Sequence, residues 1–150
     1  MRFNGNTKTT YDPMEDARYK LGYGKVSLSS LSSDNIPLAI NQLPLASKGD
    51  TIRLKVSVSV VGSYNLSLKN IEGIPQIYDI WLKDAFTKDS VNMRKDSAYS
   101  FTISTDTASY GSNRFRLILL QNPALAYKLL SFDAKKTSGR EAENNMDHEK

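Results

Sequence analysis

The 150-residue chain contains no cysteine, which excludes disulfide bridges and thiolate metal sites. Its only histidine is His148, and three of its five glutamates, Glu141, Glu143 and Glu149, also lie in the last ten residues. A histidine-based catalytic triad or metal site is therefore not expected in the body of the chain. We expect no catalytic residues, no cofactor and no bound metal.

Long apolar runs are also missing. No stretch approaches the roughly 18 apolar residues that a membrane-spanning helix needs, so we expect no membrane partner. The first residues, MRFNGNTK, lack the apolar segment of a signal peptide. If the protein is exported, we expect this sequence to be an interior piece of a longer chain.

The charge of the chain is modestly positive, with a formal net charge of +4. Six basic residues of the body are spaced irregularly along the sequence: Lys48, Arg53, Lys55, Lys69, Lys83 and Lys88. They form neither a continuous run nor a helical stripe, which are the usual signs of a phosphate-binding surface. The sequence therefore predicts no nucleic-acid partner.

What the chain does have is alternation of apolar and polar residues with a period of two, which is typical of strands with one face in a core. The pattern is strongest between Ile77 and Leu120, where it predicts four strands. Further strands are predicted at 26–31, 36–40, 51–61 and 64–68, with Gly62-Ser63 as a two-residue hairpin turn between the last two. Pro37 indicates an edge strand. About eight short strands predict an all-β fold, an antiparallel two-sheet β-sandwich of jelly-roll or immunoglobulin-like type.

A single helix is predicted near the start of the chain. Asp12 is a suitable N-cap, Pro13 suits the first helical position, and Glu15 has the spacing of a capping box. Met14 and Leu21, together with Ala17, would form an apolar face that docks on the sheets. The resulting domain is predicted to span residues 1–125. Residues 126–150 are nearly devoid of apolar side chains after about Asp133, and we expect a disordered linker there.

Four segments of the chain resemble a domain found near the carboxyl end of large exported proteins of Bacteroidota. The segments are NGNTKTTYDPMEDARYKL, SLSSDNIPLAINQLPL, GSYNL and YDIWLKDAFTKDSVNMRKDSAYSFTISTDTASYGSNRFRLIL. The resemblance covers residues 3–120. In that family a fibronectin-type module and a signal for type IX secretion often follow, and residues 126–150 resemble an incomplete start of such a module. The resemblance implies a secreted or cell-surface protein with a role in spacing or adhesion, and it implies no catalytic residue.

Several residues could still form a site, and each has a simpler interpretation. Asp12, Glu15 and Asp16 could bind Ca²⁺, or they could cap the helix. Asp79 and Asp84 lie in one strand with opposite orientation, so they cannot act as a glycosidase pair. Gly22 and Gly24 begin a GxG pattern, but Ser27 stands where a dinucleotide fingerprint needs its third glycine.

Aromatic residues raise the possibility of sugar binding. Trp81, Tyr78, Tyr99 and Phe101 could form a stacking platform, with Trp81 on the face opposite Ile80. Alternatively, Trp81 packs under a loop or under the N-terminal helix, since tryptophan is highly buried on average. Exposure of Trp81 would favour the sugar-binding hypothesis.

Four segments have the form Asp–Ser/Thr–apolar: 50–52, 89–91, 96–98 and 106–108. They resemble the O-glycosylation sequence of exported Bacteroidota proteins, and they also fit turns that lead into strands. The sequence does not separate these interpretations.

We therefore expect a non-catalytic structural or adhesive module of a secreted or cell-surface bacterial protein. The alternative is a carbohydrate-binding module attached to an enzyme domain elsewhere in the parent chain. The expected partners are neighbouring domains of that chain, with a glycan as a further candidate. Pro37 and the charged strand faces argue against edge-to-edge pairing, so we expect a monomer.

Overall fold

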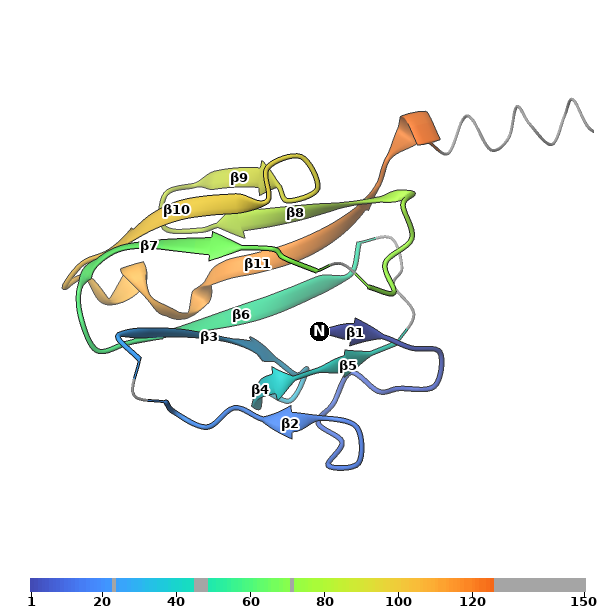
Figure 1. Ribbon diagram of the computed structural model, residues 1–150, viewed down its shortest axis with the longest axis horizontal. Helices are drawn as coiled ribbons and strands as arrows, with labels where there is room; N and C mark the ends of the chain where they lie inside the picture. Colours follow the sequence, from blue (N-terminus) through green and yellow to red (C-terminus); the bar gives the residue numbers. More distant parts are fainter. Residues whose placement is uncertain (23, 45–48, 71, 126–150) are drawn as a thin grey trace, which may run out of the picture.

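The computed structural model describes residues 1–22, 24–44, 49–70 and 72–125. These residues form eleven β-strands and a short 3-10 helix, η1, and residues 123–125, at the end of the described part, are helical (Figure 1). In chain order the elements are β1 (Arg2–Phe3), β2 (Ala17–Arg18), β3 (Val26–Leu31), β4 (Pro37–Ile40), β5 (Gln42–Leu43), β6 (Thr51–Val58), β7 (Gly62–Ser67), β8 (Tyr78–Asp84), β9 (Asp89–Asn92), β10 (Ala98–Ile103), η1 (Thr107–Ser109) and β11 (Gly111–Gln121). All eight predicted strands are present, and β1, β2 and β5 are additional strands of two residues each.

Seven of the strands form one antiparallel sheet in the order β2-β4-β3-β6-β11-β8-β9. The longest strand, β11, lies between β6 and β8 and pairs with both (Figure 1). Both of its edges are therefore hydrogen-bonded. This explains why its apolar positions Phe115, Leu117 and Leu119 are among the most buried residues of the described chain.

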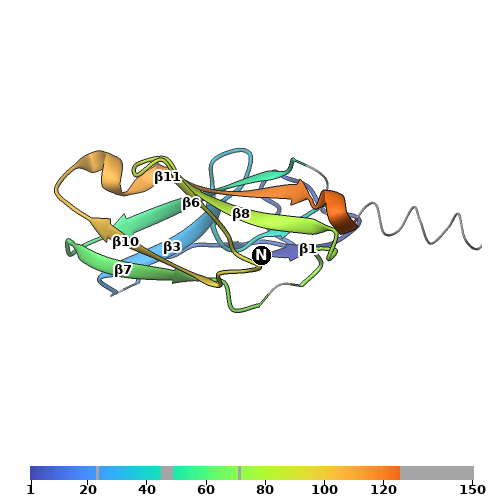
Figure 2. The ribbon, with the colours of Figure 1, turned by 90° about the horizontal axis from the view of Figure 1, so that it is seen from above.

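A small antiparallel sheet of β7 and β10 lies against one face of the large sheet (Figure 2). The ring centroids of Phe101 in β10 and Phe115 in β11 are 5.0 Å apart in an edge-to-face arrangement. Burying each such ring contributes roughly 1.5–3 kcal/mol. A parallel pair of β1 and β5 adds Leu43 to the same core.

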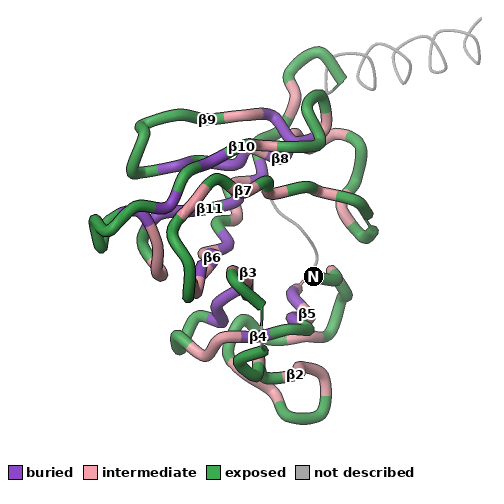
Figure 3. The backbone as a smooth tube through the Cα atoms, turned by 60° about the vertical axis from the view of Figure 1, so that its left-hand side comes forward, coloured by how far each residue is buried: buried purple, intermediate pink, exposed green. Residues whose placement is uncertain are grey.

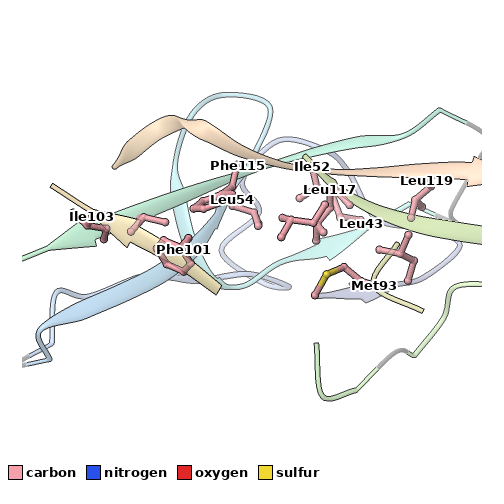
Figure 4. Packing of buried hydrophobic residues seen from close by; sticks show 12 residues of the cluster. Leu43, Ile52, Leu54, Met93, Phe101, Ile103, Phe115, Leu117 and Leu119 are labelled. Carbon is pink, nitrogen blue, oxygen red and sulfur yellow. The ribbon is translucent and has the colours of Figure 1, made fainter. Parts of the chain in front are cut away.

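The core follows directly from the alternation in the sequence (Figure 3). In β6, Ile52, Leu54 and Val56 are buried, while Arg53 and Lys55 lie on the other face. The side chains that meet between the sheets are Leu43, Ile52, Leu54, Val56, Ile80, Leu82, Met93, Phe101, Ile103, Phe115, Leu117 and Leu119 (Figure 4). We call this side of the large sheet the inner face and the opposite side the outer face.

The predicted hairpin at Gly62-Ser63 is wrong. Gly62 is the first residue of β7, and β7 pairs with β10 in the small sheet instead of with β6. The edges of β6 are already occupied by β3 and β11, so the following strand has no free edge on which to fold back. Gly62 instead has a φ of 153°, which side chains rarely adopt, where the chain crosses to the other sheet.

The predicted N-terminal helix is also wrong. Asp12 accepts hydrogen bonds from the N–H groups of Glu15 and Asp16, which closes a single turn, and the chain then continues as the extended strand β2. Met14 and Leu21, the expected docking face, are 90% and 82% exposed. Because helix nucleation is unfavourable, a two-turn helix needs an apolar face to bury, and here that face meets no partner.

The edge position predicted from Pro37 is wrong as well, because β4 lies between β2 and β3. The edges of the large sheet are the short strands β2 and β9. The described residues contain no helix that is long and apolar enough to cross a membrane. The predicted linker at 126–150 lies outside the described residues, as does His148.

Candidate functional site

One ion pair lies inside the protein, between Asp84 and Arg114. Each residue is 2% exposed, and Arg114 Nη2 lies 2.8 Å from Asp84 Oδ2. Arg114 Nε also donates to Asp84 Oδ1 and Oδ2, at 3.0 and 3.2 Å. The fork-shaped guanidinium thus binds both oxygens of the carboxylate, which is the strongest geometry for such a pair.

Strand parity and a β-bulge bring these two residues together. Asp84 follows Ile80 and Leu82 at spacings of two, so its carboxylate points to the inner face. β11 advances four residues, from Gly111 to Phe115, where β6 advances two. The bulge allows Arg114 and Phe115 to point inward although they are consecutive.

Arg114 connects three segments of the chain through its remaining donors. Its Nη1 donates to the carbonyl oxygen of Thr102 in β10 at 2.8 Å, and to that of Ser109 at the end of η1. Its guanidinium carbon lies 5.1 Å from the ring centroid of Phe101 and 4.7 Å from that of Phe115. The cation is therefore enclosed by aromatic faces, and it ties the small sheet and η1 to the large sheet.

The charge state of Asp84 is fixed by these contacts. Burial by itself would raise the pKa of the carboxyl group, but the hydrogen bonds and charge of Arg114 and the N–H of Phe86 outweigh burial and lower the pKa. Tyr99 also donates to Asp84 Oδ2 at 3.1 Å, and its own pKa is raised by burial. A surface hollow of about 530 Å³ borders Arg114, but the guanidinium is already bonded to the protein. The cluster is therefore built to hold the fold together.

The outer face of the large sheet has a different character. Trp81 lies there half-buried, directly opposite Asn92 of β9 on one side and Ile118 of β11 on the other. Asp79 lies two residues away on the same face, where Asn122 Nδ2 is 3.4 Å from its Oδ1. The predicted helix does not cover Trp81, and Trp81 is not fully buried, so part of the residue is accessible on the face that also carries Asp79.

Three basic residues form a row across this outer face. Arg116 in β11 lies directly opposite Arg53 in β6 and directly opposite Lys83 in β8. Lys55 lies two residues from Arg53 on the same face. We call Arg53, Arg116 and Lys83 the basic row. Residues that are scattered in the sequence are thus adjacent in the sheet, and only the strand register shows it.

The other aromatic candidates do not join Trp81. Phe101 is buried in the core, and the hydroxyl of Tyr99 is directed to Asp84. Tyr78 is half-buried on the inner side of β8. The proposed stacking platform of four aromatic residues is therefore not assembled, and Trp81 is the member that lies on the outer face.

The acidic candidates for Ca²⁺ binding are engaged with the backbone. Asp16 accepts hydrogen bonds from the N–H groups of Asp12 and Gln42, at 2.9 and 2.8 Å, and Asp12 accepts one from Met14. Within the described ranges, the structure gathers no group of three or more residues suited to hold a metal. Asp79 and Asp84 lie on opposite faces of β8, as the parity of the strand predicts.

The four Asp–Ser/Thr segments all present exposed hydroxyl-bearing residues: Thr51, Ser90, Ser97 and Thr107. Two of the aspartates also serve local turns. Asp106 caps η1 by accepting the N–H of Ala108 at 2.9 Å, and Asp89 accepts the N–H of Ser90 at 2.8 Å. The exposure of the hydroxyl groups is compatible with glycosylation, and the two aspartate hydrogen bonds are typical of turns.

Sequence reasoning missed the Asp84–Arg114 pair, although one signal was present. Asp84 shares the parity of Ile80 and Leu82, which places a carboxylate on the core face. β11 begins at Gly111, so Arg114 lies inside the strand. Comparisons with protein-family models, with curated proteins and with solved structures found no match for this chain.

Proposed function

We propose that this chain is a non-catalytic adhesive or structural module of a secreted or cell-surface bacterial protein. We assign its two facing sheets to an antiparallel β-sandwich of jelly-roll or immunoglobulin-like type, because β7 and β10 pack on the inner face of the large sheet. The resemblance of residues 3–120 to a domain of exported Bacteroidota proteins supports the extracellular setting.

The observation that carries the proposal is the division of polar groups between the two faces. On the inner side, the ionisable groups of Asp84 and Arg114 are hydrogen-bonded to each other and to backbone groups. On the outer side, Lys83 and Arg116 are exposed, and part of Trp81 is accessible. The polar groups of the outer face are therefore accessible to a partner, while the buried charges of the inner face stabilise the fold.

A carbohydrate-binding module is the second candidate, and Trp81 favours it. An indole offers a flat apolar surface with a polar edge, which suits the faces of sugar rings. Asp79, on the same face, supplies carboxylate oxygens that accept hydrogen bonds from sugar hydroxyls. This function would serve an enzyme domain elsewhere in the parent chain.

The test is affinity electrophoresis of the purified chain through gels that contain different polysaccharides, together with a reducing-sugar assay. Retardation without release of reducing ends is the expected result for a non-catalytic adhesive module. Release of reducing ends would overturn the non-catalytic proposal. For the second candidate, Trp81→Ala should abolish retardation and leave the melting temperature near that of the wild type. Loss of folding would instead make Trp81 a structural residue.

A further inference from the structure

The basic row is an unfavourable arrangement for the protein by itself. Directly opposite residues in neighbouring strands have Cβ atoms about 4.5–5.5 Å apart, and like charges at such positions are destabilising. Arg116 faces a cation on each side, Arg53 and Lys83. Among the residues that the structure describes, ion pairs are formed by Lys8 with Asp12 and by Arg114 with Asp84, and none includes the basic row. Unfavourable placements such as these adjacent like charges occur most often at functional surfaces.

The row is also partly pre-oriented. Arg53 Nη2 donates to Asn35 Oδ1 at 2.6 Å and to the carbonyl oxygen of Ser32 at 3.5 Å, which holds the guanidinium against the turn after β3. Lys83 and Arg116 are exposed and keep their donors toward solvent. Since neighbouring strands are about 4.8 Å apart, the backbone positions of the three residues span about 10 Å across the sheet. The Arg53 guanidinium extends beyond this span, toward the turn after β3.

We propose that this outer face binds an acidic polysaccharide whose sugars carry carboxylate groups, as in a polyuronate. This inference rests on the proposed adhesive function and names the ligand of that surface. The carboxylates lie on Arg53, Arg116 and Lys83, with Lys55 as a flanking cation. A neighbouring sugar ring lies against Trp81, and its hydroxyl groups donate to Asp79.

Charge complementarity supports the carboxylate groups. Basic side chains from three successive strands suit a polymer with about one charge per sugar, and the arginine fork matches a carboxylate in two hydrogen bonds. Asp79 is the only acid among the outward positions of β6, β8 and β11. Along β8, Asp79 lies beyond Trp81 from Lys83, which is the nearest residue of the basic row in that strand. The outer face therefore has a basic part and a part that suits hydroxyl groups.

The same features argue for a polysaccharide over a nucleic acid. Proteins that bind single strands usually combine a basic groove with several aromatic side chains that stack on successive bases. Here Trp81 is the one aromatic residue among the outward positions of β6, β8 and β11, so successive bases would find no series of stacking partners. A sugar polymer with spaced carboxylates and free hydroxyls meets both parts of the face.

The experiment measures binding of the whole chain to polygalacturonate by isothermal titration. Its methyl-esterified form, dextran and poly(dT) serve as comparison ligands. The test variant is Lys83→Gln with Arg116→Gln, and the matched control is Lys69→Gln, an exposed lysine that follows β7. Because removing like-charge repulsion does not harm the fold, the double variant should melt at or above the wild-type temperature.

We expect the double variant to lose about tenfold or more in affinity for polygalacturonate, and Lys69→Gln to lose less than about twofold. Raising the salt from about 0.05 to 0.3 M should weaken the wild type more than the double variant, because exposed charges are screened. Equal affinity of the double variant and the wild type would overturn the inference, and so would tighter binding to poly(dT). Binding to dextran that depends on Trp81 alone would overturn it and leave the proposed function standing, whereas absence of binding to every polysaccharide would remove the adhesive function as well.

Discussion

Replacing Arg114 with methionine is the sharpest test of how this fold is held together. Methionine keeps most of the aliphatic length but removes every donor of the guanidinium. Asp84, which is 2% exposed, would then keep only the N–H of Phe86 and the hydroxyl of Tyr99 as hydrogen-bond donors. The carbonyl oxygens of Thr102 and Ser109 would lose a donor as well.

The expected loss of stability is large. Removing one partner of a buried, hydrogen-bonded ion pair costs about 3–5 kcal/mol, because a charge is left uncompensated in the interior. Domains of this size have a free energy of unfolding of about 5–15 kcal/mol, so the loss is a substantial part of the total. It corresponds to a fall in melting temperature of about 10–20 °C.

Urea unfolding followed by tryptophan fluorescence measures the loss, since Trp81 is the only tryptophan. The matched control is Arg116→Met, the same substitution two residues along β11 on the outer face, where we expect a change below about 0.5 kcal/mol. Combining Arg114→Met with Asp84→Leu should recover at least about 2 kcal/mol relative to Arg114→Met alone, because no unpaired charge is left. The reasoning is refuted if Arg114→Met costs no more than Arg116→Met, or if the losses in the double variant simply add.

Three further results are expected. The pKa of Asp84 is lowered in the folded protein, so its contribution to stability is complete above the unfolded value of about 3.9 and is lost as pH falls below it. Asp84→Asn should therefore be less stable at neutral pH but lose less stability than the wild type between about pH 4 and 2; parallel curves of urea midpoint against pH would contradict this. Gly73 has a φ of 74°, and an added Cβ would lie 2.9 Å from a carbonyl oxygen of β1. Gly73→Ala should thus destabilise the protein by more than about 1 kcal/mol, measured as a lower melting temperature. The control Gly22→Ala, whose added Cβ meets no atom within 4 Å, should not lower the melting temperature. Equal effects of the two substitutions would show that β1 can shift to accommodate the added Cβ at Gly73. Finally, Met14→Ser and Leu21→Ser should each change stability by less than about 0.5 kcal/mol, because both side chains are exposed. A loss of about 2 kcal/mol by calorimetry would instead support the hypothesis of a docked helix.

The alternation of residues was enough to predict the strands and the inner residues of each. Ile52, Leu54 and Val56 in β6, and Phe115 and Leu117 in β11, are buried as their parity predicts. The reason is local, because successive side chains of any strand point to opposite faces and the apolar ones must find a core. Helix prediction failed where local signals for capping were present but no apolar surface was available for docking.

Pairing between strands could not be predicted in the same way. Whether β7 returns to β6 or crosses to β10 depends on which edges other strands already occupy, and that is a property of the whole sheet. The bulge in β11 could not be predicted from the sequence either, because a bulge exists only relative to the partner strand, here β6.

The basic row and the buried Asp84–Arg114 pair show most clearly which properties come from the sequence and which come from the folded sheet. By itself, the sequence determined which residues are basic and, where a strand is regular, which face each occupies. Only the register placed Arg53, Arg116 and Lys83 side by side, and only the bulge turned Arg114 inward to Asp84. Charges act over a few ångströms, so their effect depends on distances between strands that are remote in sequence, and those distances exist only in the folded sheet.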